Sequence, residues 1–169
     1  MKTYVALLRA INVGGTGKLP MAQLRELCEK TGFTEVRTYI QSGNVLLKSP
    51  LAEAKVQAKL EEALRSKMGK GVGVLVRSGA ELADILARNP FGKAPPNRVI
   101  VFLLDEKPPK DALASLVIPG KEVVKVSGRE VFVHYPDGQG VSKLKLPFLK
   151  AATGRNLNTL AKLAALAKD

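Results

Sequence analysis

Three clusters of polar residues stand at the ends of expected strands and helices, where ligand sites often form. Guanidinium groups bind phosphates and carboxylates, and Asn, Gln and Ser orient a ligand through directional hydrogen bonds. The clusters therefore predict a site for an anionic ligand, although turn formation and helix capping use the same residue types. The members are Arg9 and Asn12; Arg37, Tyr39, Gln41, Ser42 and Asn44; and Thr153, Arg155, Asn156, Asn158 and Thr159.

A glycine-rich loop at residues 12–18 lies between the first expected strand and the first expected helix. Backbone N–H groups in such a loop can bind an anion, and Lys18 would add positive charge. The loop does not match the Walker A pattern, because Asn12 stands where the first Gly belongs and Leu19 follows the lysine. It also fails the dinucleotide pattern, since Pro20 replaces the third Gly. Both an anion-binding loop and a plain turn agree with this sequence.

The usual catalytic and metal-binding groups are scarce. His134 and Cys28 are single residues of their type, so the chain has no Cys/His cluster that could hold zinc. We therefore expect no cofactor, no metal and no catalytic constellation. An enzyme would have to use Tyr39 or Lys143 as its proton carrier.

The chain is strongly basic. It has 27 Lys and Arg against 15 Asp and Glu, a formal net charge of +12, and the excess is spread over both halves. Such a charge attracts nucleic acid and other anions. No apolar run is long enough to span a bilayer, no signal peptide precedes the first strand, and one cysteine excludes an internal disulfide. We expect a cytoplasmic protein with no membrane contact.

The apolar pattern predicts an α+β fold. The expected elements follow the order βαββαβ, which is the ferredoxin-like unit, within residues 1–77. RNA-recognition modules share this arrangement but stack bases on aromatic residues of the two central strands. Those strands offer only Tyr4 here, so we do not expect such a module. The expected elements are strand 3–10, a helix from Pro20 to Gly32, strands 36–41 and 44–48, a helix from Ser49-Pro50 to about Met68, and strand 72–76.

The second half repeats the first loosely, without a sequence repeat that would prove duplication. We expect a second α+β half at 78–137, packed on the first, and C-terminal helices at 138–169. Asn158 is suited to cap the last helix. The expected elements are helix 80–88, strand 98–104, helix 108–116, strands 122–126 and 130–135, a short helix near Pro147, a turn around Gly154 and a helix to the end.

Several stretches resemble a bacterial family of domains of unknown function, number 1697. The resemblance implies a cytosolic α+β protein built from ferredoxin-like elements in two intertwined halves, and it implies no activity. Leu157 departs from the family, which would place Trp there. The stretches are residues 4–15 (YVALLRAINVGG), Pro20-Met21, Leu24-Arg25, residues 36–45 (VRTYIQSGNV), Asn89-Pro90-Phe91, Ser142-Lys143-Leu144 and residues 153–159 (TGRNLNT). The family's motif positions include Arg9, Asn12, Arg37, Gln41, Ser42, Asn44, Arg155 and Asn156.

Three functions agree with these observations. The first is a non-enzymatic protein that binds nucleic acid or nucleotide phosphate, and we expect this one. The second is an enzyme acting on a small phosphorylated or carboxylated metabolite, and the third is a structural or interaction protein with no ligand. In the first, Arg9, Lys18, Arg37 and Arg155 supply charge, and Asn12, Gln41, Ser42 and Asn44 orient the ligand. Tyr39 and Asn156 complete the expected binding residues.

Overall fold

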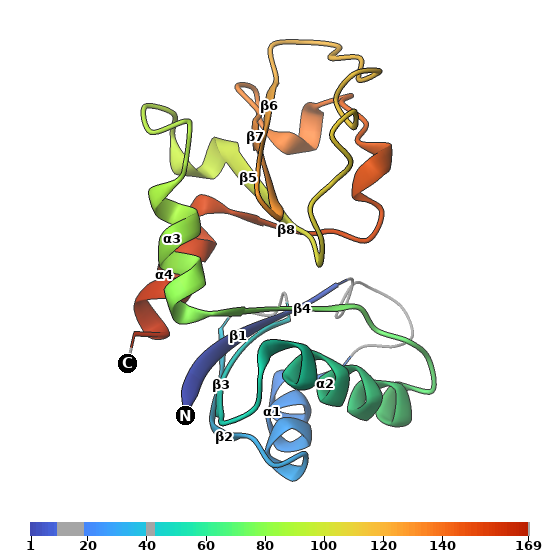
Figure 1. The fold of residues 1–169 in the computed structure, drawn as a ribbon, viewed down its shortest axis with the longest axis vertical. Helices are drawn as coiled ribbons and strands as arrows, with labels where there is room; N and C mark the ends of the chain where they lie inside the picture. Colours follow the sequence, from blue (N-terminus) through green and yellow to red (C-terminus); the bar gives the residue numbers. More distant parts are fainter. Residues whose placement is uncertain (10–18, 40–42, 169) are drawn as a thin grey trace. The chain divides into compact units, whose positions relative to one another are not determined.

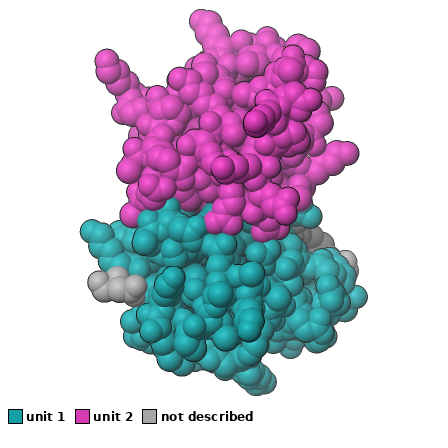
Figure 2. Space-filling model, viewed as in Figure 1, with its two compact units in different colours: residues 1–82, 163–169 teal, residues 83–162 magenta. Residues whose placement is uncertain are grey.

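The computed structural model describes residues 1–9, 19–39 and 43–168. The chain divides into two compact units, coloured separately in Figure 2. Unit 1 comprises residues 1–82 and 163–169, and unit 2 comprises residues 83–162. The boundaries fall inside helix α3 (Gly79–Ala87) and helix α4 (Leu157–Leu166).

Unit 1 contains the ferredoxin-like arrangement that the sequence predicts. Its four strands form a sheet in the order β2-β3-β1-β4, and every neighbouring pair is antiparallel. Helices α1 and α2 lie together on one face of this sheet (Figure 1). The elements are β1 (Lys2–Leu8), α1 (Met21–Lys30), β2 (Thr34–Tyr39), β3 (Asn44–Ser49), α2 (Glu53–Met68) and β4 (Val74–Ser78).

The core of unit 1 forms between that face and the two helices. Alternate strand residues point into it because successive side chains of a strand point to opposite faces. Helix residues three or four apart supply the other half, as the helical period requires. The buried members include Tyr4, Ala6 and Leu8 of β1, Val45 and Leu47 of β3, Val74 and Val76 of β4, Leu24 and Cys28 of α1, and Val56, Leu60 and Leu64 of α2.

Two helix starts differ in their chemistry. Helix α2 begins at Glu53 rather than at the expected Ser49-Pro50, because Ser49 ends β3 and its Oγ accepts a hydrogen bond from Leu51 N at 3.1 Å. Helix α3 begins with a capping box, in which Ser78 Oγ accepts from Glu81 N at 3.2 Å. In return, Glu81 Oε1 accepts from Ser78 N at 3.1 Å.

Unit 2 has a second sheet with the same strand topology. Its strands are β5 (Val99–Leu103), β6 (Val123–Ser127), β7 (Glu130–His134) and β8 (Thr153–Asn156), in the order β6-β7-β5-β8 with antiparallel neighbours. Strands β5, β6, β7 and β8 thus take the places that β1, β2, β3 and β4 take in unit 1. The loose repetition noted in the sequence is a repetition of sheet topology.

The connections between these strands differ from those of unit 1. The expected helix at 108–116 is wrong, since residues 109–116 form successive turns closed by bonds such as Ala112 N to Pro109 O at 3.0 Å. Proline at 108, 109 and 119 leaves too few residues for a stable helix without strong tertiary packing. The expected short helix near Pro147 is a 3₁₀ turn, Pro147–Leu149.

The expected turn around Gly154 is also wrong, because Gly154 lies inside strand β8 opposite Phe102. A Cβ at Gly154 would lie 2.8 Å from a Phe102 ring carbon. Glycine therefore allows the Phe102 ring to lie close to the backbone of β8, which is a common reason for glycine within a strand.

Candidate functional site

One face of the unit 1 sheet carries a row of residues with an arginine on each edge strand. The register places Arg37 of β2, Leu46 of β3, Val5 of β1 and Arg77 of β4 side by side. Directly paired residues point to the same side of a sheet. The alternate residues of β1 pack with α1 and α2. This arginine row of unit 1 therefore lies on the face away from those helices.

Arg77 is the most deeply buried charged side chain of the row, with 1% of its surface exposed. Its Nη1 donates to Val76 O at 3.1 Å. Burying a guanidinium is costly unless polar or anionic groups surround it. Arg77 is not among the residues that the sequence pattern predicts for the site. The sequence feature that could have identified Arg77 is its position near the end of a strand with apolar residues on both faces.

Arg37 lies at the other end of the row and has a structural partner. Its Nη2 donates to Leu166 O at 2.7 Å, where helix α4 ends. A cation at a helix C-terminus satisfies a free carbonyl group and interacts favourably with the helix dipole. This contact explains Arg37 without a ligand.

Arg37 also lines a hollow of about 480 Å³ in unit 1. Lys48 and Lys168 contribute two more cations to it, and Glu35 contributes one carboxylate, which pairs with Lys48 at 2.9 Å. Glu35 sits in a β-bulge of β2 with φ of 47°, a conformation that is uncommon for a residue other than glycine. The lining of this hollow is therefore net positive.

Tyr39, Asn44 and Arg9 lie on the same face, toward the end of β1. In the strand register, Tyr39 of β2 lies opposite Asn44 of β3, and Asn44 lies opposite Leu7 of β1. Asn44 is buried, and its Nδ2 donates a hydrogen bond to Tyr39 O at 3.0 Å. Arg9 N donates to Gly73 O at 2.9 Å, which continues the β1–β4 ladder. A Cβ at Gly73 would lie 3.5 Å from Arg9 Nε, so the Arg9 side chain lies beside Gly73.

The structure thus brings Arg9, Arg37, Tyr39 and Asn44 onto one face of one sheet. Four other predicted site residues, namely Asn12, Lys18, Gln41 and Ser42, lie outside the described residues.

Unit 2 carries a second row of the same kind. Lys125 of β6, Phe132 of β7, Val101 of β5 and Arg155 of β8 lie side by side, on the face away from the core cluster that contains Ile100. By strand order and by face, Arg155 takes the place on β8 that Arg77 takes on β4. The guanidinium contact is repeated as well, because Arg155 Nη1 donates to Gly154 O at 2.9 Å.

The environment of Arg155 disfavours its charge. Burial lowers the pKa of the Arg155 guanidinium to about 10, well below its ordinary value, since the charged form loses hydration. The sequence selected Arg155 because it stands in a polar cluster, and the structure places it within a strand rather than beside a turn.

Asn156 has a capping role. Its Oδ1 accepts from Thr159 N at 2.8 Å, directly before α4 begins at Leu157. Asn156, and not the expected Asn158, therefore caps this helix.

Two further classes of site were tested on the described part of the chain. It holds no group of three or more His, Cys, Asp or Glu side chains that could bind a metal ion. Within the same residues, no helix combines the length and the apolar character needed to cross a membrane.

Comparison with known proteins gives a family and a similar solved structure. A family model described as a protein of unknown function (DUF1697) matches residues 1–132. The solved structure of the conserved bacterial protein SP0830 from Streptococcus pneumoniae is similar, with 27% sequence identity, 99% coverage of each chain and a TM-score of 0.83. A search of curated proteins gave no match.

Proposed function

This chain belongs to the DUF1697 family of proteins of unknown function, and we propose that it binds an anionic ligand, nucleic acid or nucleotide phosphate, without catalysis. The observation that carries the proposal is the pair of arginines, Arg77 and Arg155, at corresponding positions on the two sheets. A cytoplasmic location goes with this function, because nucleotides and nucleic acids are abundant there.

The pair of arginines is difficult to explain by folding alone. A guanidinium group has five N–H donors and a permanent charge, and burial of that charge lowers stability. An apolar side chain of similar length, such as Met, would cover the same sheet surface without this cost. Arginine at both positions favours a role in which its charge is used. In this proposal Arg155 contacts the ligand, and Arg77, which is 1% exposed, adds positive potential behind the sheet face.

The other cations of unit 1 extend the positive surface. Arg9 lies on the same sheet face, and Arg37, Lys48 and Lys168 line the 480 Å³ hollow. Several spaced cations suit a ligand with several phosphate groups, because each neutralised phosphate adds to the affinity. In this proposal Asn12, Lys18, Gln41 and Ser42 complete the ligand contacts, with Tyr39, Asn44 and Asn156 fixing the strands and the helix that carry the site.

The chemistry of these residues favours recognition of phosphates over recognition of bases. Arginine and lysine contact the backbone of a nucleic acid, whereas base stacking needs exposed aromatic rings. On β1, the aromatic residue is Tyr4, which is 2% exposed and packs in the core with α1 and α2. We expect affinity that depends strongly on salt and weakly on base sequence.

Fluorescence anisotropy with labelled single-stranded RNA, single-stranded DNA and duplex DNA, across a salt series, tests the proposal. We expect binding that persists near physiological salt and falls linearly on a log–log plot. Arg155→Ala should weaken it at every salt concentration. Lys59→Ala, which removes an exposed charge from α2, is the matched control and should have a smaller effect. Binding that disappears at modest salt, or that both variants weaken equally, would show a diffuse charge effect and overturn the proposed site.

A further inference from the structure

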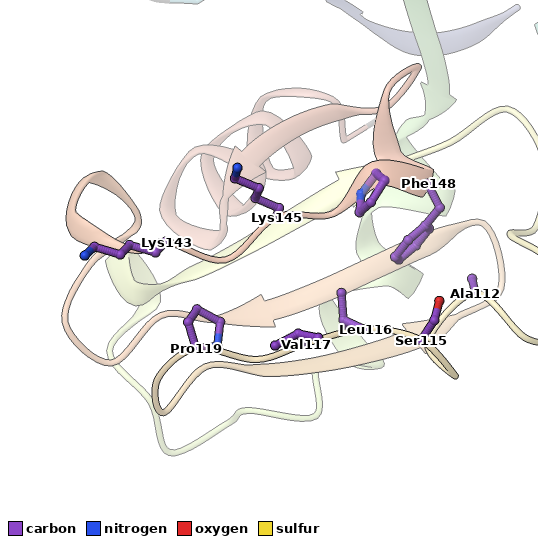
Figure 3. A pocket seen from close by; sticks show the side chains of 9 residues that line it. Ala112, Ser115, Leu116, Val117, Pro119, Lys143, Lys145 and Phe148 are labelled. Carbon is purple, nitrogen blue, oxygen red and sulfur yellow. The ribbon is translucent and has the colours of Figure 1, made fainter.

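Unit 2 contains a hollow of about 470 Å³ between two connecting segments, residues 112–119 and residues 143–148 (Figure 3). Leu116, Val117 and Pro119 line one side, and Phe148 lines the other, with its ring pointing toward the segment that carries Leu116. Small-molecule sites commonly have volumes of about 300–1,000 Å³. The hollow therefore has the size and the apolar lining of a small-molecule site.

The position of the hollow follows from the repeated topology. In unit 1 the connections between β1 and β2 and between β3 and β4 are the helices α1 and α2, which pack together in one core. In unit 2 the corresponding connections contain turns and short 3₁₀ segments. The hollow lies between these two connections, so unit 2 leaves open the space that helix packing fills in unit 1.

The surface around the hollow is unusually apolar for an exposed surface. Val117 has 79% of its surface exposed, and its neighbour Ile118 has 43%. Val141, which lines an adjoining hollow of about 200 Å³, has 71% exposed. Contiguous exposed apolar residues beside a hollow are typical of a binding surface.

The charges at the hollow have one sign. Lys143 and Lys145 line it, and its lining includes no acidic residue. The adjoining hollow is different, because Lys121 and Lys143 line it together with Glu122 and Asp137. Glu122 accepts a hydrogen bond from Ser142 Oγ at 2.6 Å. A ligand that fills the larger hollow would meet apolar side chains and two ammonium groups.

We propose that this hollow binds a small amphipathic anion, a molecule with an apolar aromatic or aliphatic body and one carboxylate, sulfonate or phosphate group. The apolar body lies between Leu116 and Phe148, and the anionic group lies at Lys143 and Lys145. This site is separate from the arginine rows, and its ligand differs from a nucleic acid because the lining is mainly apolar.

Two fluorescent probes with the same aromatic body test the proposal on the full chain. 8-Anilinonaphthalene-1-sulfonate carries a sulfonate group, and N-phenyl-1-naphthylamine does not. We expect saturable binding of the sulfonate probe to the native protein. Because hydrogen bonds to charged groups contribute about 1.5–3 kcal/mol, Lys143→Gln/Lys145→Gln should weaken it about tenfold or more. The neutral probe should bind both proteins alike.

Lys59→Gln/Lys67→Gln is the matched control, because it removes two exposed lysines from α2. Phe148→Ala should weaken both probes, and Val117→Asn, at a side chain that is already exposed, should do so without a risk to folding. An equal effect of the two lysine pairs would overturn the proposal. The proposal would also be overturned if Arg155→Ala lost binding of the sulfonate probe while Lys143→Gln/Lys145→Gln bound it normally. That result would assign the probe to the arginine rows.

Discussion

Replacing Arg155 by Met should stabilise the protein while weakening its binding to nucleic acid. The lowering of the Arg155 pKa to about 10 corresponds to about 3 kcal/mol of unfavourable burial in the folded state. Arg155→Met removes this cost and also removes the contacts of the guanidinium, among them the hydrogen bond to Gly154 O, which contributes about 1 kcal/mol. We therefore expect the free energy of unfolding to rise by about 2 kcal/mol.

The sign of the pH dependence follows from the same values. The folded-state pKa of Arg155 lies below its unfolded-state pKa. The cost of burial is therefore fully present below about pH 10 and is lost as the pH rises from there toward the unfolded-state pKa. Between pH 6 and pH 9 the difference between Arg155→Met and the wild type should therefore stay constant. Urea unfolding followed by circular dichroism measures it, and thermal unfolding should show a rise in Tm of about 4–8 °C.

The control for this prediction is Lys59→Met, which removes an exposed charge from α2 and should change stability by less than about 0.5 kcal/mol. If Arg155→Met lowered the free energy of unfolding by 1 kcal/mol or more, Arg155 would be a structural residue whose contacts outweigh the cost of burial. That result would refute the argument that its charge is kept for a ligand.

Three further predictions concern groups outside the arginine rows. Cys28 of α1 is buried, and burial raises the pKa of its thiol to about 12. Ellman's reagent at pH 8 should therefore label it only after unfolding. Rapid labelling of the native protein would contradict this. Arg88→Ala should lower the free energy of unfolding by about 3–5 kcal/mol. Arg88 Nη2 lies 2.6 Å from Oε1 of Glu130, which is 3% exposed, so the substitution leaves a buried carboxylate without this partner. The double variant Arg88→Ala/Glu130→Gln should recover part of the loss in the same urea assay. Ser78→Ala should cost about 1 kcal/mol through loss of the α3 capping box, whereas Ser78→Thr should stay near the wild type.

The first sheet could be predicted from the sequence because its signals are local. Continuous apolar runs mark β1, β3 and β4, and alternating residues mark β2. Gly32 and Gly69, which both have positive φ, end the two helices as expected. The second sheet could be predicted only in part. The four residues of β8 include Gly154 and Asn156, which favour turns, and only pairing with β5 makes them a strand.

The candidate site shows the same division between local and distant effects. Arg37 and Arg155 were selected because charged residues stood in polar clusters, which is visible in the sequence. The bond from Arg37 to Leu166 O joins residues 129 positions apart, and no local pattern announces it. The equivalence of Arg77 and Arg155 depends on two strand orders, so it required the sheet topologies.

The most direct test of the central claim is the arginine Nε–Hε spectrum of the ¹⁵N-labelled protein during titration with the oligonucleotide that binds most tightly by anisotropy. Resonances would be assigned with Arg77→Met and Arg155→Met. The proposed function predicts that the Arg77 and Arg155 signals shift saturably, with the Kd measured by anisotropy. Unchanged Arg77 and Arg155 signals at saturation would contradict it and assign the binding to the general surface charge.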